Sequence, residues 1–299
     1  MATEAVAKTG TVAAPPSPLR SALRSVGTGS RNFYKVMRAN PLTLIGFILV
    51  LFISLTAVLV VLVPAVTSAL GHPASLTPYD PNYIPPACPI IANKTVCAQP
   101  PSGDHFFGTD RSGRDLFSRV LAALPLDRAI GFLIAGFSLL LGAALGLIAG
   151  FWDKPGTIGG AISVVIMRVT DVFLAFPSLV LALAIAASLG RGLQSSMLAI
   201  MVSWWPYYVR LARGEVLAVK NLPYVTAAKA AGVSDWRILS RHVFRNIVEP
   251  LTVYYTMDIG NVIVTFSTIS FIGIGVPPSI PEWGSMVEQY EKLLLVYPW

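Results

Sequence analysis

The chain has 299 residues, of which 54% are hydrophobic and only 12% are charged. A soluble domain carries about 25% charged residues on average, so the composition excludes an ordinary soluble enzyme. The mean hydropathy of +0.66 and several long uncharged stretches predict an all-α integral membrane protein, because a helix satisfies its own backbone groups in lipid.

Residues 1–40 form a basic tail that is rich in Ala, Pro, Ser and Thr at its start. We expect this tail to be cytosolic and partly disordered, and it lacks the short apolar core of a cleavable signal peptide. The first predicted span follows at 41–63. Its residues 42–63 carry no charge, and they are long enough to cross a bilayer, which takes ~20 apolar residues.

An extracytoplasmic loop is predicted at 64–128. It contains Cys88 and Cys97, which we expect to form a disulfide worth about 2–3 kcal/mol in the chain-entropy model; two free thiols are the alternative. Between them, Asn93 begins an Asn-Lys-Thr sequon, a glycosylation candidate that depends on the host cell. Residues 113–121 predict an amphipathic helix at the outer membrane face.

Residues 129–299 contain four further predicted spans, at about 129–151, 158–189, 196–208 and 251–276. The glycines of the second span suit close helix packing: Gly131, Gly136, Gly142, Gly146 and Gly150. The fourth span is short and ends in aromatic residues that resemble an interfacial belt: Trp204, Trp205, Tyr207 and Tyr208.

Basic residues are distributed unequally between the two predicted sides of the membrane. The N-terminal tail is basic, and the segment after the fourth span adds Arg210, Arg213, Lys220, Lys229, Arg237, Arg241 and Arg245. The 64–128 loop balances its basic residues with acidic ones. The positive-inside rule therefore predicts a multi-pass cell membrane protein with a cytosolic N-terminus. The net charge of +7 reflects this asymmetry and not a nucleic-acid surface.

The segment 217–246 is a polar, basic helix-turn-helix between apolar stretches. Pro223 suits the start of its first helix, alanines follow, and Gly232 suits the end. Ser234 is placed to cap the second helix. Such a segment gains nothing from lipid, so we expect it to project into the cytosol and bind a protein partner. An ordinary connecting loop is the alternative, although most connections are much shorter.

No catalytic or metal-binding constellation is evident in the sequence. It lacks the G-x-x-x-x-G-K-[ST] loop that holds nucleotide phosphates. His72, His105 and His242 show no metal-ligand spacing and no Ser/His/Asp grouping. The sequence therefore predicts a protein that is not an enzyme and that binds no cofactor or metal directly.

Segment 224–235, Tyr-Val-Thr-Ala-Ala-Lys-Ala-Ala-Gly-Val-Ser-Asp, resembles the E-A-A-x-x-x-G loop of permease subunits in ABC importers. Further blocks are similar, in order, to the second permease of the dipeptide/oligopeptide class. They are Arg-Ala-Asn-Pro-Leu at 38–42, Phe-Gly-Thr-Asp at 107–110, Gly-Arg-Asp at 113–115, Asp-Val-Phe-Leu-Ala-Phe-Pro at 171–177, Arg-Gly-Glu-Val at 213–216, Ser-Phe-Ile-Gly-Ile-Gly at 270–275 and Trp-Gly at 283–284.

This resemblance implies a type I ABC importer transmembrane domain, with the permease core at 129–299 and a cytosolic coupling loop at 214–248. The implied partners are a second permease, two ATPase subunits that bind ATP and Mg²⁺, and an extracytoplasmic substrate-binding protein. The implied cargo is oligopeptides or similar small oligomers; oligosaccharides are the alternative. The residues expected to dock on the ATPase are Tyr224, Thr226, Ala227, Ala228, Gly232, Ser234 and Asp235.

Two residues of the coupling loop depart from the family pattern. Thr226 stands where the family usually has Glu, so an ion pair to the ATPase is not carried over, and Arg245 stands where Pro is frequent. Anionic membrane lipid is an alternative partner for Arg241 and Arg245.

A departure in the fifth span suggests the substrate path. The family often has an acidic residue near Phe266, where this chain is apolar, and Asp258 lies about two turns earlier. An acid inside a span is a functional-site candidate, so Asp258 and Asn261 are predicted to line the path. The alternative is an Asp near the inner end of the span that is hydrated or paired with an Arg. In the third span, Arg168 and Asp171 are spaced to neutralise each other.

Relatives of this class have a sixth span and a cytosolic tail after the Trp-Gly block. This chain stops at Trp299, where that span would begin, so we expect five spans here and a natural protein that continues for one more.

Two rival functions come from other classes. A secondary transporter or channel without ATPase partners would need more intramembrane charges than Arg168, Asp171 and Asp258 provide. A membrane-tethered DNA-binding protein is disfavoured because spans on both sides of the helix-turn-helix would hinder its entry into a major groove, so no nucleic-acid partner is predicted.

Overall fold

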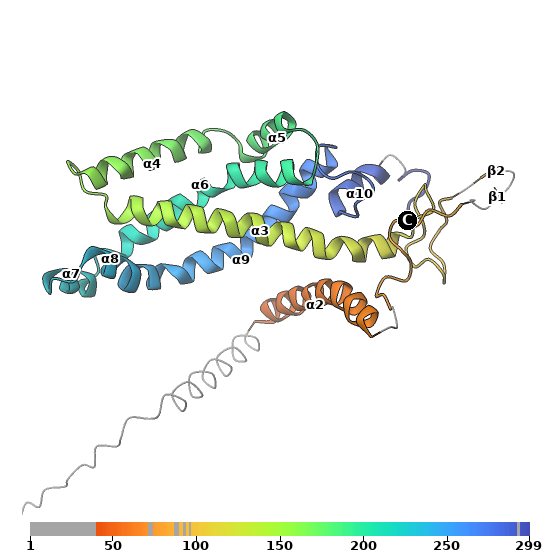
Figure 1. Ribbon diagram of the computed structural model, residues 1–299, viewed down its shortest axis with the longest axis horizontal. Helices are drawn as coiled ribbons and strands as arrows, with labels where there is room; N and C mark the ends of the chain where they lie inside the picture. The colour runs from red at the N-terminus through yellow and green to blue at the C-terminus, as the bar shows by residue number, and fades with distance from the viewer. Residues whose placement is uncertain (1–39, 71–73, 87–89, 92–93, 96, 292–293) are drawn as a thin grey trace, which may run out of the picture. The chain divides into compact units, whose positions relative to one another are not determined.

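The computed structural model describes residues 40–70, 74–86, 90–91, 94–95, 97–291 and 294–299 (Figure 1). These residues are mainly helical, which confirms the helical class. The one sheet among them is an antiparallel pairing of β1 (Ile90–Ile91) with β2 (Lys94–Thr95) in the predicted outer loop. The helices are α2 (Pro41–Ala69), α3 (Leu116–Phe151), α4 (Ile158–Leu174), α5 (Ser178–Leu189), α6 (Leu193–Val219), α7 (Pro223–Ala230), α8 (Asp235–Ile238), the π-helix η1 (Leu239–Val243), α9 (Phe244–Phe271) and α10 (Trp283–Tyr290).

The chain divides into two compact units, residues 1–55 and 56–299, and α2 passes through the boundary. The second unit contains the other described helices and every site discussed below.

Two of the described helices, α2 and α3, are long and apolar enough to cross a membrane. The α4–α5 pair, bent by 84°, makes a third if it is one span. The five predicted spans are therefore not confirmed as a set. Although α6 and α9 have 27 and 28 residues, they are not apolar enough to count as spans, because polar and charged residues interrupt their apolar sequences. The expected continuation beyond Trp299 stays a prediction.

Three helices differ in extent from the sequence prediction. The expected amphipathic helix at 113–121 is not separate, because the helix that starts at Leu116 continues as α3 through Pro125 to Phe151. Asp115 fixes this start, since its Oδ2 accepts a hydrogen bond from the Ser118 backbone N–H at 2.7 Å. The predicted fourth span is part of the longer α6. The second helix of the helix-turn-helix runs through η1 directly into α9.

Glycines of α3 let its backbone approach α6, and the two helices run side by side (Figure 1). A Cβ on Gly146 would lie 2.6 Å from the Val209 carbonyl oxygen, and one on Gly150 would lie 2.7 Å from the Val216 Cβ. Gly142 is equally tight against Trp205 and Tyr208, and Gly131 makes the same kind of approach to α9. The packing prediction is thus confirmed for these glycines but not for Gly136, whose nearest such neighbour is the Tyr255 hydroxyl at 3.8 Å.

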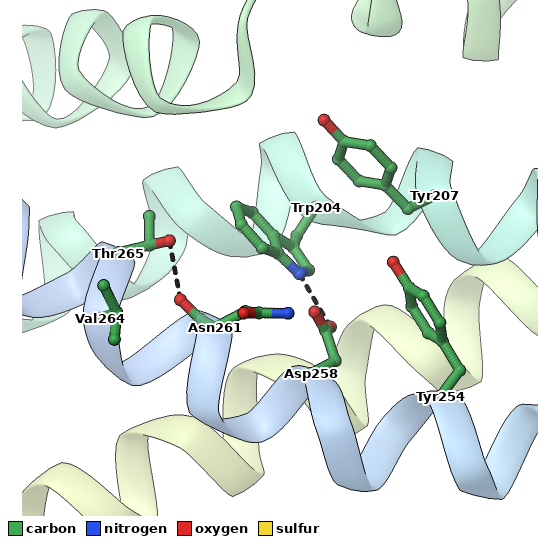
Figure 2. Close-up of a pocket in the computed structure, with 7 residues that line it drawn as sticks. All are labelled: Trp204, Tyr207, Tyr254, Asp258, Asn261, Val264 and Thr265. Atoms are coloured by element: carbon green, nitrogen blue, oxygen red, sulfur yellow. Dashed lines mark hydrogen bonds between the residues drawn. The ribbon is translucent and has the colours of Figure 1, made fainter.

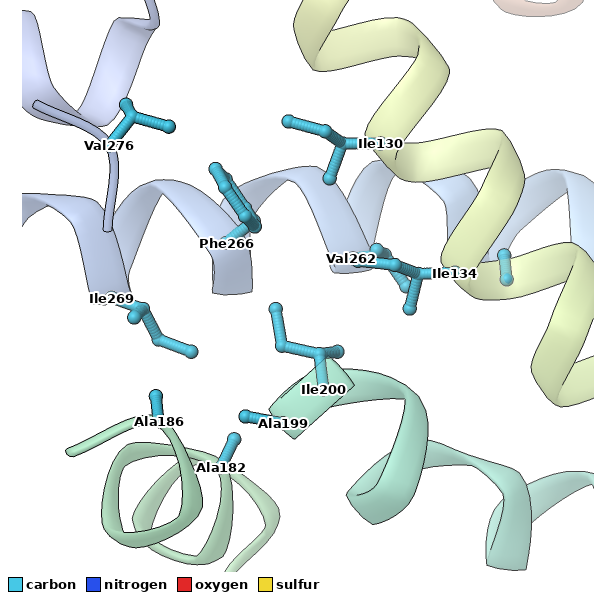
Figure 3. Close-up of a cluster of buried hydrophobic side chains, with 11 residues drawn as sticks. Ile130, Ile134, Ala182, Ala186, Ala199, Ile200, Val262, Phe266, Ile269 and Val276 are labelled. Atoms are coloured by element: carbon cyan, nitrogen blue, oxygen red, sulfur yellow. The ribbon is translucent and has the colours of Figure 1, made fainter. Parts of the chain in front are cut away.

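A cluster of buried apolar side chains joins α3, α5, α6 and α9 (Figure 3). Phe266 is its one aromatic member and is 1% exposed. Its neighbours in the cluster are Ile130, Ile134, Ala135, Ala182, Ala186, Ala199, Ile200, Val262, Ile269 and Val276. These contacts make Phe266 part of the apolar core that holds α9 against the other helices.

A polar network ties the segment before α3 to α10. Asp110 Oδ2 accepts hydrogen bonds from Arg114 Nε at 2.6 Å and from the Tyr290 hydroxyl at 2.9 Å. The fully buried Arg119 and its neighbour Arg114 both donate to the Pro278 carbonyl oxygen, at 3.0 and 3.1 Å. Burial, with Asp110 adding to it, raises the pKa of Tyr290 to about 12, so its phenol stays a neutral donor. The Gly-Arg-Asp block and the residues around the Trp-Gly block are therefore joined in one hydrogen-bond network.

Replacing Gly146 with Ala is expected to separate α3 from α6, because the added methyl group would press on a backbone oxygen. We expect a loss of about 1–3 kcal/mol in the free energy of unfolding, measured as a lower Tm in detergent. Gly136→Ala is the matched control and should hold or raise the Tm, since Ala favours a helix by up to about 1 kcal/mol. Equal melting of the two variants would contradict the role given to the glycine contact.

Candidate functional site

The predicted coupling segment forms a compact turn between α6 and α9. Pro223 is the first residue of α7, as expected from its missing N–H. Gly232 follows the helix with a φ of +76°, a left-handed conformation that favours glycine. Its N–H donates to the Lys229 carbonyl, and the Val233 N–H reaches back to Ala228. Ser234 occupies the N-cap position of α8, but its side chain makes no capping hydrogen bond, so that detail of the prediction is wrong.

Six of the seven predicted docking residues are exposed. Tyr224 is 42% exposed, and the others with exposed side chains or backbone are Thr226, Ala227, Gly232, Ser234 and Asp235. Ala228 differs, because it is half-buried and packs with Val233 against the protein's own apolar cluster. We call the six exposed residues the coupling surface. Trp236, which is 70% exposed beside it, was not singled out from the sequence.

Buried and charged contacts fasten α7 to the end of α3. Val225 is fully buried in a cluster with Phe151, Val216 and Ile247. Lys229 Nζ lies 5.3 Å from the centre of the Phe151 ring, a cation–π contact. Lys220 Nζ donates to the Gly150 carbonyl oxygen at 2.8 Å, one of the carbonyls left open at a helix C-terminus. The segment that carries the coupling surface is therefore in direct contact with the C-terminal end of α3.

The connection from α8 to α9 is a π-helix. In η1 the wider turn leaves Leu239 and Val243 buried on one side, while the His242 ring lies near Tyr224, with ring centroids 6.5 Å apart. A single π-turn inside an α-helix shifts the faces on either side of it. No signal in the sequence distinguished this turn from ordinary helix.

A pocket of about 330 Å³ opens between α6 and α9 (Figure 2). We call it the α6–α9 pocket. Its lining includes both residues predicted for the substrate path, Asp258 and Asn261, and the rest are Trp204, Tyr207, Tyr254, Val264 and Thr265. The aromatic residues that resembled an interfacial belt thus contribute instead to this pocket and to the core. Tyr208 is fully buried and Trp205 is 8% exposed.

Asp258 is held by aromatic donors. Its carboxylate oxygen Oδ2 accepts hydrogen bonds from Trp204 Nε1 and from the Tyr208 hydroxyl, both at 2.8 Å. Only 2% of the residue is exposed, and the Asn261 side chain points toward it (Figure 2). Within the described part of the chain, no Lys or Arg forms an ion pair with Asp258. The alternative of an Arg-paired Asp is therefore wrong for these residues.

The acidic residue of α4 has a different partner from the expected one. Asp171 Oδ1 contacts Arg210 Nη2 of α6 at 2.8 Å, and no ion pair with Arg168 is found. This pairing joins α4 to α6. It was not visible in the sequence because the two residues are 39 positions apart.

The predicted outer-loop sites are not tested. Cys88 and Asn93 lie outside the described residues, so the disulfide to Cys97 and the glycosylation site stay predictions. Among the residues that are described, no group of three or more His, Cys, Asp or Glu side chains could hold a metal ion.

Residues 129–297 match the protein family described as "Binding-protein-dependent transport system inner membrane component". The probable D,D-dipeptide transport system permease protein DdpC of Escherichia coli is 40% identical over 224 residues, which cover 75% of this chain and 70% of that protein. The glutathione transport system permease protein GsiD of Pectobacterium atrosepticum is 36% identical, and the match covers 66% of this chain and 64% of that protein. The dipeptide transport system permease protein DppC of Alkalihalophilus pseudofirmus is 32% identical, covering 90% and 80%.

The chain therefore spans between 64% and 80% of the length of these three relatives. Among solved structures, the MetNI methionine ABC transporter in inward facing conformations gives a TM-score of 0.49 at 16% identity, covering 58% of this chain and 81% of that chain. This similarity is too weak to carry an argument.

Replacing Lys220 with Met is expected to loosen α7, because Met keeps the apolar stem and loses the hydrogen bond to Gly150. A hydrogen bond from a charged group contributes about 1.5–3 kcal/mol, so amide exchange in residues 222–233 should accelerate about tenfold or more. Hydrogen–deuterium exchange read by mass spectrometry gives the rates. Arg237→Met is the matched control on the exposed face of α8 and should leave them unchanged. Unaltered exchange in Lys220→Met would show that this contact does not hold the segment.

Proposed function

Because this chain belongs to the family of binding-protein-dependent transport system inner membrane components, we propose that it is one of two permease subunits of an ATP-driven ABC importer that takes up small peptides. Membership in this family also confirms that the chain is a membrane transport subunit and not an enzyme. The three relatives above are named as permeases for D,D-dipeptides, glutathione and dipeptides, which favours peptides over oligosaccharides as cargo.

The coupling surface is the observation that carries the proposal. It exposes the small residues Ala227 and Gly232, which permit close docking of another protein, and Gly232 sets the angle between α7 and α8. The same segment is fastened to α3 through Lys220 and Val225. A partner that moved this surface would therefore move the membrane helices with it. A secondary transporter or channel has no use for such a surface.

The proposed assembly contains this chain, a second permease, two ATPase subunits and an extracytoplasmic binding protein. ATP and Mg²⁺ would bind to the ATPase subunits, and this chain would contribute half of the translocation path. The α6–α9 pocket is the proposed part of that path, because it is a hollow between two bundle helices. Asp258 and Asn261 give its largely apolar lining a carboxylate and an amide. In this arrangement the type I importer fold has its N-terminus and coupling surface in the cytosol and the 64–128 loop outside.

Replacing the exposed Ala227 with Trp is expected to uncouple the importer. The bulky ring would obstruct docking at a cost of about 1–3 kcal/mol, which corresponds to about tenfold or more in coupled ATPase activity. The coupled activity is measured as substrate-stimulated ATP hydrolysis by the assembled complex in proteoliposomes. Ala228→Trp tests folding instead, since Ala228 packs inward.

Ala74→Trp, an exposed alanine on the predicted outer side, is the matched control and should retain coupling. Normal substrate stimulation in an assembled Ala227→Trp complex would count against the docking role of α7.

The proposed orientation is tested by two single cysteines placed in a Cys88→Ser/Cys97→Ser background. With Arg237→Cys, on the exposed face of α8 and outside the coupling surface, a membrane-impermeant maleimide should label the protein only after the cells are permeabilised, because α8 is cytosolic in this proposal. With Ala74→Cys, the same reagent should label intact cells. The reverse labelling pattern would contradict the proposed orientation and support the opposite one.

A further inference from the structure

The α6–α9 pocket surrounds a carboxylate with aromatic rings. Trp204 and Tyr207 lie with ring centroids 5.8 Å apart, and both line the pocket beside Asp258 (Figure 2). Tyr254 lines it from α9 and packs edge-on against Tyr208 at 5.1 Å. The face of an aromatic ring is the negative side of its quadrupole. A cation bound beside Asp258 that lies over one of these faces gains a cation–π attraction in addition to the ion pair.

Asp258 has hydrogen-bond donors but no counter-ion from the described residues. The ion pairs found there involve other carboxylates, those of Asp110, Asp115, Asp153 and Asp171. The two donors to Oδ2 are neutral side chains, Trp204 and Tyr208. A carboxylate removed from water and lacking a counter-ion favours any cation that reaches it. The group best placed to reach it is one carried by a molecule in the pocket.

We propose that the α6–α9 pocket binds an alkylammonium group of the transported molecule, either the free amino terminus of a peptide or a lysine side chain. The inference rests on the proposed function, because it names the chemical group by which the cargo is held in its path. Asp258 would pair with the ammonium, while the faces of Trp204 and Tyr207 would enclose its methylene neighbours.

The strength of this interaction suits a transport path. A single ion pair supported by ring contacts retains a charged group and still releases it, as a transport path requires. The volume of about 330 Å³ accommodates the end of a peptide and not its whole length. A sugar hydroxyl would also donate to Asp258, but it carries no positive charge to pair with the carboxylate. The pocket chemistry therefore favours peptides over oligosaccharides.

The test measures the binding of small probes to the assembled complex in the absence of its binding protein. Tryptophan fluorescence reports binding, and Trp204→Phe identifies the contribution of Trp204 to the signal. Three probes distinguish an ammonium group at the amino terminus from one on a lysine side chain: alanyl-alanine, N-acetyl-alanyl-alanine and N-acetyl-lysine amide. We expect alanyl-alanine to bind about tenfold or more tightly than its acetylated form, the factor equivalent to a desolvated cation contact. Binding of N-acetyl-lysine amide would extend the site to side-chain ammonium groups. This comparison needs no variant at Asp258.

Two variants at the carboxylate sharpen the result. Asp258→Asn should reduce the affinity ratio between free and acetylated probes to near one. The exchanged pair Asp258→Asn/Asn261→Asp keeps one carboxylate and one amide in the pocket, and it should recover part of the ratio. If Asp258 only holds Trp204 and Tyr208 in place, Asp258→Asn would weaken both probes equally and leave the ratio unchanged, which would overturn the inference.

Failure of the inference can be separated from failure of the proposed function. ATP-driven peptide uptake by the wild-type complex, with equal binding of free and acetylated probes, would remove the ammonium site and keep the importer. Preferential binding of the free amine by a complex that takes up no peptide would keep the site and remove the peptide-importer assignment.

Discussion

The close approach of α3 to α6 is the constraint on which the rest of the bundle depends. Two helices in lipid gain little from apolar contact alone, so their association relies on close packing between small residues. Gly142 brings α3 against Tyr208, and this fixes the phenol that donates to Asp258. Gly150 brings the end of α3 against Val216 and presents its carbonyl to Lys220. One row of glycines therefore determines the geometry of the pocket and of the coupling surface.

Local patterns in the sequence predicted the features that depend on neighbouring residues. The glycine row of α3, the Pro223 start and the Gly232 end of α7 follow from spacing and backbone chemistry. Features that depend on distant residues were missed or assigned differently. The Asp171–Arg210 pair joins separate helices, and the inward face of Ala228 is set by what α7 packs upon.

Part of the limited hydropathy of α6 and α9 comes from polar groups that they bury. Ser196 and Ser203 of α6, like Asp258 of α9, are at most 3% exposed, so their side chains face the protein interior and not lipid. Asp258 is satisfied by donors on α6, and Ser203 donates to its own helix backbone. A window of hydropathy cannot separate a polar residue that faces lipid from one that faces the bundle. Sequence alone therefore located these helices without fixing their limits.

The π-turn of η1 also sets the direction of the pocket relative to the exposed face of α8. Each hydrogen bond of a π-turn spans one residue more than in an α-helix, so residues of α8 and α9 that would share a face of a continuous α-helix are rotated apart. Tyr254 and Asp258 are four residues apart and share one face of α9. Leu239 and Val243 are buried in an apolar cluster, which holds this offset in place. The five residues of η1 therefore determine which side of the bundle the carboxylate of Asp258 faces.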